Sequence, residues 1–69
     1  MSVAKNIEIT STSNVSFEDA IRSGIERASK TIDHVRGAWI KEQKVSVTDG
    51  KVTEYCVMMI ITFVLSDGE

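Results

Sequence analysis

The feature that most constrains this chain is the stretch Thr53–Leu65, which contains no Gly or Pro and is rich in β-branched and aromatic residues. This composition predicts one long β-strand. Successive side chains of a strand point to opposite faces, and here both faces are largely apolar. One face carries Tyr55, Val57, Met59, Ile61, Phe63 and Leu65. The other carries Glu54, Cys56, Met58, Ile60, Thr62 and Val64.

Two apolar faces need two covers, whereas an antiparallel strand with one face in water alternates between apolar and polar residues. The chain offers only one candidate helix, and one helix covers one face. We therefore expect an obligate oligomer, in which other subunits cover the second face. The size of the chain agrees, because small domains without disulfides or metals often gain stability by association.

The first two elements are predicted from periodicity and capping residues. Val3–Thr10 alternates as a strand with one dry face, and the polar residues 11–14 predict a turn. Ser16 is a good N-cap, and Asp19 stands at the third helical position of a partial capping box. One apolar stripe of the helix is formed by Ile21, Ile25, Ala28 and Ile32. We expect the helix to end near Val35.

Three glycines mark special positions. Gly24 in the middle of a helix costs about 1 kcal/mol relative to Ala, so it predicts close backbone packing. Gly37 is the expected stop signal of the helix. Gly50 follows Asp49, and Asp-Gly is a strong hairpin signal that joins Ala38–Val47 to the long strand.

The predicted order is strand, helix, strand, hairpin, strand, which defines an α+β fold in a single domain over residues 1–69. A crossover through a helix makes the first two strands parallel to each other. The long strand then lies in the centre of a three-stranded antiparallel sheet that partly wraps one helix. Strict alternation places Trp39 and Gln43 on the same side of their strand as Cys56, on the face that the helix leaves bare.

Composition excludes several classes of function. The net charge is −2, and the eight Lys and Arg residues are scattered, so we expect no nucleic-acid partner. A single cysteine favours a reducing compartment. Residues 1–10 lack the apolar region of a signal peptide, and no apolar run reaches membrane-spanning length. These features predict a cytoplasmic protein without a membrane partner.

Catalytic and metal-binding residues are scarce. Cys56 and His34 are the one conceivable nucleophile–base pair, but nothing places them together, and we expect an inert buried thiol. Zinc needs about four nitrogen or sulfur ligands, and the chain offers two. The Asp-Gly turn lacks the spaced carboxylates of a calcium loop, and there is no Gly-rich phosphate loop. We therefore expect no enzyme and no metal site.

Trp39 is the remaining candidate for a functional residue. A large amphipathic side chain on the bare face has two interpretations, both of which rest on its apolar ring and N–H group. It packs at a subunit interface, or it is a stacking platform for a flat aromatic ligand.

An ordered set of segments resembles the dodecin family across nearly the whole chain. The set comprises Thr12-Ser13, Ser16–Ile21, Glu26–Thr31, Val35–Trp39, Lys41–Gln43, Asp49–Val52, Glu54-Tyr55 and Thr62–Leu65. The resemblance implies the same β-α-β-β fold and a hollow homododecamer. It also implies binding and sequestration of a flavin (riboflavin, FMN or FAD), without catalysis.

The resemblance also implies a ligand site on the bare face. Flavin-binding members stack a Trp at the position of Gly37, and Trp39 lies two residues later on the same face. They place a Gln at the position of Cys56 to hydrogen-bond the flavin edge. The predicted binding residues are therefore Trp39 for stacking, with Cys56, Gln43 and Gly37 lining the site. The alternative is a dodecin-fold assembly without a flavin pocket that is structural or binds ions.

Overall fold

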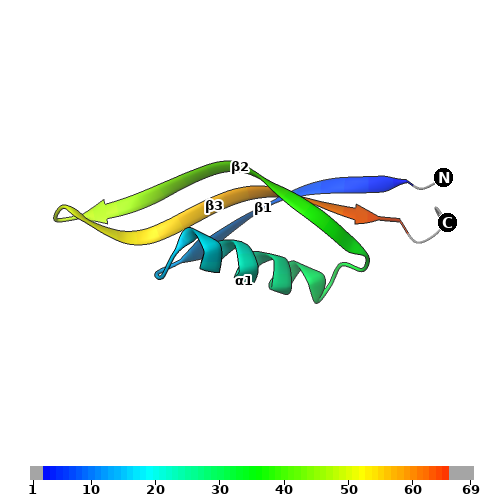
Figure 1. The fold of residues 1–69 in the computed structure, drawn as a ribbon, viewed down its shortest axis with the longest axis horizontal. Helices are drawn as coiled ribbons and strands as arrows, with labels where there is room; N and C mark the ends of the chain where they lie inside the picture. Colours follow the sequence, from blue (N-terminus) through cyan, green and yellow to red (C-terminus); the bar gives the residue numbers. More distant parts are fainter. Residues whose placement is uncertain (1–2, 66–69) are drawn as a thin grey trace.

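The computed structural model describes residues 3–65. Its elements follow in the predicted order β-α-β-β (Figure 1). They are strand β1 (Ala4–Ser13), helix α1 (Phe17–Ser29), strand β2 (Val35–Thr48) and strand β3 (Lys51–Val64). The predicted α+β fold is therefore confirmed.

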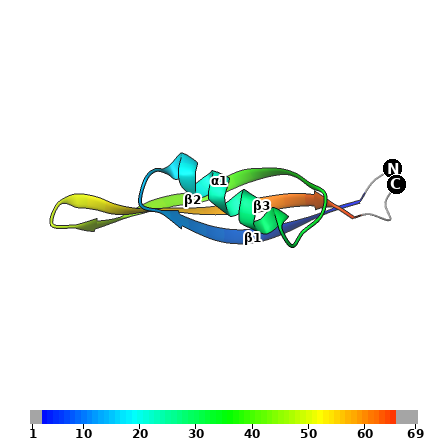
Figure 2. The same cartoon turned by 90° about the horizontal axis from the view of Figure 1, so that it is seen from below.

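Strand β3 lies in the centre of the sheet, in the order β1-β3-β2. Both neighbours run antiparallel to it, so β1 and β2 are parallel to each other, as a helical crossover requires. Helix α1 lies across one face of this single layer, and the other face has no covering element in residues 3–65 (Figures 1 and 2). The structure thus confirms that one helix covers one side of a two-faced strand.

The core lies between α1 and the odd-numbered residues of β3. Val57, Met59 and Ile61 are fully buried there, and Ala20 of the helix is fully buried against them. Partly buried side chains complete the cluster, namely Ile9, Phe17, Ile21 and Ile25. The ring of Phe17 meets Tyr55 edge to face, with centroids 5.1 Å apart, a favoured arrangement of aromatic pairs.

Gly24 lets the helix approach the sheet closely, as its position predicts. A Cβ atom added there would lie 2.6 Å from Met59 Cε and 2.9 Å from Ser11 Cβ, both closer than carbon atoms approach. The absence of a side chain at Gly24 therefore sets the spacing between α1 and the sheet.

The start of the helix is held by a relay that extends the predicted capping box. Ser16 is the N-cap, and its Oγ accepts the Asp19 N–H at 2.9 Å. The Asp19 carboxylate accepts the Ser13 hydroxyl at 2.7 Å, and Ser13 Oγ in turn accepts the Val15 and Ser16 N–H groups. Ser13 is 7% exposed, so this buried hydroxyl ties the end of β1 to the start of α1.

The predicted helix end near Val35 is wrong, because α1 ends at Ser29. Val35 already pairs with Phe63 in the sheet, and the His34 carbonyl accepts the Val64 N–H at 3.1 Å. His34 adopts a left-handed φ of 65°, which turns the chain from the helix into β2. Gly37 is therefore a strand residue and no stop signal.

The strands are longer than their periodicity predicts. β1 continues to Ser13 through residues expected to form a turn, and β2 begins at Val35 instead of Ala38. The Asp-Gly hairpin is confirmed, with φ of 53° at Asp49 and 76° at Gly50, as a type I′ turn requires. This hairpin projects past the N-terminal end of α1 (Figure 1), so the chain is elongated, 52 Å long and 19 Å wide.

Candidate functional site

The sheet face opposite α1, here called the open face, carries the predicted binding residues. Directly paired residues of neighbouring strands project to the same side of a sheet. Trp39 pairs with Ile60, and Ile60 pairs with Glu8 on its other side, so these three side chains form one row across the open face. Trp39 is 51% exposed, which is a large accessible apolar surface for an indole ring.

Gly37 occupies the next row of the open face, paired with Thr62. Thr62 also pairs with Asn6 and donates its hydroxyl to the Asn6 side-chain oxygen at 2.7 Å. A Cβ atom added at Gly37 would meet nothing within 4 Å. The row next to Trp39 therefore has free space above Gly37, on the face where a ring would stack on the indole.

A β-bulge in β2 rearranges the residues that follow Trp39. Ile40 pairs with Met59, but Glu42 pairs with Met58, so Lys41 is an extra residue on β2. Two residues of the bulged strand then oppose one of the partner, and the alternation of faces shifts by one position. Glu42 and every second residue after it are carried to the open face.

Gln43 is the predicted binding residue that this bulge displaces. It pairs with Val57, which is fully buried on the helix-covered side, so Gln43 projects to that side. The prediction that Gln43 shares a face with Trp39 and Cys56 is wrong, because strict alternation does not account for an extra residue at Lys41. Lys44 takes the position beside Cys56 instead.

Cys56 does lie on the open face, but in a different place from Trp39. It pairs with Thr12 and Lys44, four residues from Ile60 along β3, or about 13 Å at about 3.3 Å per residue. Cys56 is only 8% exposed. A single small ring over Trp39 therefore does not reach Cys56 of the same subunit.

Charged side chains frame the open face. The sequence pattern did not single them out. Lys41 Nζ lies 3.0 Å from Glu8 Oε1, so this ion pair spans β3 from one outer strand to the other. Both side chains are about half exposed, and such pairs contribute at most about 1 kcal/mol. Glu42 and Lys44 follow on the same face. The bulge at Lys41 places these two charged residues on the open face, and the sequence pattern does not reveal the bulge.

Cys56 and His34 are not brought together. The His34 carbonyl bonds Val64, which lies eight residues from Cys56 along β3, or about 26 Å at about 3.3 Å per residue. Within residues 3–65, no three His, Cys, Asp or Glu side chains gather as a metal site. No helix in that range has the length and apolarity that crossing a membrane requires.

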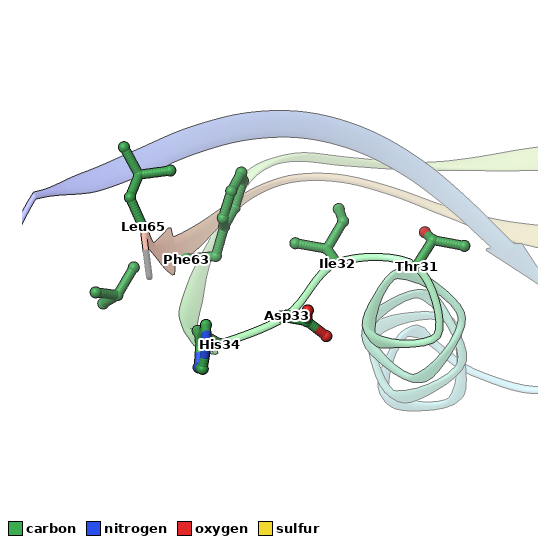
Figure 3. A pocket seen from close by; sticks show the side chains of 7 residues that line it. Thr31, Ile32, Asp33, His34, Phe63 and Leu65 are labelled. Atoms are coloured by element: carbon green, nitrogen blue, oxygen red, sulfur yellow. The ribbon is translucent and has the colours of Figure 1, made fainter. Parts of the chain in front are cut away.

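A separate hollow of about 290 Å³ lies where α1 connects to β2 (Figure 3). Phe63 of β3 and Leu65, which follows the strand, form one wall, and Ile32, Asp33 and His34 of the connection form the other. It contains only two ionisable side chains and is open to solvent on one side. It is therefore a weaker candidate for a ligand site than the open face.

Comparison with known proteins gives one consistent family. Residues 3–66 match the family model described as Dodecin. The chain is 32% identical to the dodecin of Thermus thermophilus over 65 residues, covering 94% of each. It is 38% identical to the calcium dodecin of Mycobacterium tuberculosis over 64 residues, covering 91% of this chain and 89% of that protein.

Solved structures agree in fold. A crystal structure of a Thermus thermophilus dodecin variant matches with a TM-score of 0.90 at 32% identity, covering 96% of this chain and 98% of that one. The dodecin of Streptomyces davaonensis matches at 0.89 with 29% identity, covering 94% and 96%. The Mycobacterium tuberculosis protein, described as calcium chelating, matches at 0.80 with 31% identity, covering 97% and 96%.

Proposed function

This chain belongs to the dodecin family, and on that basis we propose that it forms a homododecameric cage that binds and sequesters flavin without catalysis. The observation that carries the proposal is Trp39, half exposed on a sheet face that its own helix leaves uncovered. The apolar side chains of Met58 and Ile60 on that face give other subunits a surface to bury. We place the cage in the cytoplasm, since the chain has a single cysteine and this one is buried.

Trp39 and Gly37 are the residues that fit a flavin. Trp39 supplies an aromatic plane for the isoalloxazine ring, and Gly37 leaves the neighbouring surface free for it. Cys56 and Gln43 do not fit this role within one subunit, the first because of its distance and the second because of its face. We therefore confine the flavin contacts of the chain to Trp39 and Gly37, with Lys41 and Glu8 at the rim.

Fluorescence titration tests the proposal directly, because Trp39 is the only tryptophan of the chain. A flavin stacked on Trp39 quenches its emission, so riboflavin or FMN should quench it at a saturable stoichiometry. The variants at this position contain no tryptophan, so quenching of the flavin's own emission measures their binding. Trp39→Ala should abolish flavin binding while the mass of the assembly stays unchanged, and the aromatic control Trp39→Phe should retain part of the affinity.

The same titration distinguishes stacking from packing. If Trp39 only packs between subunits, Trp39→Ala lowers the mass of the assembly. Flavin then does not quench the tryptophan of the unmodified protein, and neither protein quenches the emission of the flavin itself. That result would contradict flavin binding and leave the family assignment intact. Gly37→Trp adds an aromatic ring where a new Cβ has free space, and it should tighten flavin binding if the open face is the site.

An ion-binding assembly without flavin is the second candidate, and it is favoured by the relative named calcium dodecin. Calcium takes about six to eight oxygen ligands, and residues 3–65 contain no cluster of three candidate side chains. Such a site would therefore draw carboxylates from more than one subunit. Calorimetric titration with calcium tests it, and heat that saturates at one ion per subunit or fewer would support it.

A further inference from the structure

A groove of about 470 Å³ runs between α1 and β1, on the helix-covered side of the sheet. Its walls are Ile9, Thr10 and Ser11 of β1 and mostly small or apolar residues of α1 and of the segment that follows it. These are Ser23, Gly24, Arg27, Ala28, Thr31 and Ile32. The groove is lined mostly by aliphatic and small side chains, and Arg27 is the one charged residue that lines it.

Strand β1 offers a free backbone edge along this groove. It is an outer strand, and its register with β3 runs without a break from Ala4 to Ser13. The Leu65 N–H bonds the Val3 carbonyl, so odd-numbered residues of β1 direct their N–H groups to β3. Thr10 and the other even-numbered residues then direct theirs outward. An unbroken edge of this kind is a template for another strand.

The projecting hairpin, residues 45–54 and here called the arm, carries the matching surface. Val45 pairs with Tyr55 on the helix-covered side, and Val47 pairs with Val52. The exposed fractions of the three valines are 40%, 59% and 48%. The arm extends past the N-terminal end of α1 (Figure 1), so its own helix does not cover them.

The outer edge of β2 is regular in the arm. The extra residues of β2 lie at Arg36 and Lys41, before the arm begins, and the irregularity after Ser46 places its extra residue, Thr53, on β3. The segment 42–48 therefore presents an unbulged edge. Its side chains alternate, so Val45 and Val47 share one face.

We propose that the arm of a second copy docks in this groove by adding its β2 edge to the β1 edge. Two regular edges then form one sheet across the subunits, which is the strand-addition mode of recognition. The helix-side faces of the two sheets become continuous, so the partner's valines lie against Ile9, Ala28 and Ile32. The arm carries two acidic residues, Asp49 and Glu54, and one basic residue, Lys51, and its resulting net charge of −1 complements Arg27, the one charge of the groove.

This inference rests on the proposed homo-oligomer and assigns one of its interfaces. It concerns the helix-covered side and the β1 edge, whereas the flavin proposal concerns the open face. An experiment can therefore contradict one of these two proposals and leave the other intact. Loss of the arm contact changes the mass of the assembly, and loss of Trp39 changes the bound chromophore.

Substituting the most exposed valine of the arm tests the interface. Val47→Lys should weaken assembly at least tenfold in analytical ultracentrifugation, because it places an ammonium group in the apolar groove. The matched control is Val15→Lys, since Val15 is 72% exposed in the loop before α1 and lies outside both surfaces. The control should sediment as the unmodified protein. Equal sedimentation of both variants and the unmodified protein would overturn the proposal.

Hydrogen exchange on the unmodified protein gives a test that needs no substitution. The outward N–H of Thr10 has no partner from residues 3–65, so it exchanges rapidly unless another strand covers it. We expect it to be protected at least a hundredfold in the assembly and to lose that protection in Val47→Lys. Rapid exchange in the assembly, or protection that survives Val47→Lys, would show that the arm does not occupy this edge.

Discussion

The two faces of β3 are almost equally apolar, but they differ in how far the chain buries them. On the helix-covered face, Val57, Met59 and Ile61 are fully buried, and small residues of α1 lie against them. On the open face, Met58 and Ile60 retain solvent exposure, and Trp39 is 51% exposed. The first face therefore stabilises the subunit, and for the second we propose that other subunits cover it.

The surroundings of the two faces differ as well. Around the covered face, the groove is lined mostly by small and aliphatic side chains and ends at the free edge of β1, and the arm carries three exposed valines. Around the open face, charged residues of β1 and β2 frame the apolar strip, with the pair Lys41–Glu8 spanning β3. A charged rim around an apolar centre is the usual anatomy of a surface that binds a ligand or a subunit.

Substitutions of the two adjacent methionines of β3 should show the largest difference between the two faces. Met59→Ala should lower the free energy of unfolding by about 2–5 kcal/mol, because it opens a cavity under α1. Met58→Ala is the matched control on the open face and should leave the subunit folded while weakening assembly. Urea denaturation followed by circular dichroism measures the first effect, and light scattering measures the second. Equal losses of subunit stability would mean that the two faces are not distinct.

Substitutions of two glycines compare the packed helix-covered face with the uncovered open face. Gly24→Ala should destabilise the protein by about 1–3 kcal/mol, because its new methyl group meets Met59 and Ser11. Gly37→Ala adds the same group on the open face, where nothing lies within 4 Å, and should change stability by less than about 0.5 kcal/mol. Thermal denaturation of both variants checks this. A neutral Gly24→Ala would contradict the close approach of α1.

The buried hydroxyl of Ser13 tests the junction that holds α1 over the covered face. Ser13→Ala should cost about 1–2 kcal/mol, because two backbone N–H groups lose their acceptor and Asp19 loses a donor. Ser29→Ala, at an exposed position of the same helix, is the control and should be near neutral. Chemical denaturation curves measure both. If Ser29→Ala lowered the free energy of unfolding as much as Ser13→Ala, the stabilising role of the Ser13 hydrogen bonds would be refuted.

The smallest effect is expected at the turn that leads from α1 to β2. His34 holds a φ of 65°, and a left-handed conformation costs about 1–2 kcal/mol for a residue with a side chain. His34→Gly should therefore raise stability, by about 0.5 kcal/mol after the added backbone entropy of glycine. His34→Ala keeps the constraint and should not raise it. Differential scanning calorimetry of the pair is the measurement.

Most of the fold was predictable because its signals are local. The β-branched and aromatic composition of β3, the cap at Ser16 and the Asp-Gly turn each act within a few residues, and all three predictions are confirmed. The end of the helix was not predictable in this way. Residues 30–34 are compatible with a helix, but pairing of Val35 with Phe63, far away in sequence, takes the chain into the sheet.

The candidate site was predictable only in part, for the same reason. Trp39, Gly37 and Cys56 lie on the predicted face because alternation holds from Gly37 to Ile40 in β2 and from Glu54 onward in β3. Gln43 does not, because the bulge at Lys41 depends on the register between two strands and leaves no residue signature. The same bulge brings the charged residues Glu42 and Lys44 to the open face.

The most direct test of the account is the mass of the unmodified protein in solution. Size-exclusion chromatography with light scattering should give one peak at about twelve times the 7.6 kDa chain mass. Visible absorbance at that peak after incubation with riboflavin or FMN would place a flavin on the assembly. A stably folded monomer of 7.6 kDa would contradict the central claim that the open face of β3 is apolar because other subunits cover it.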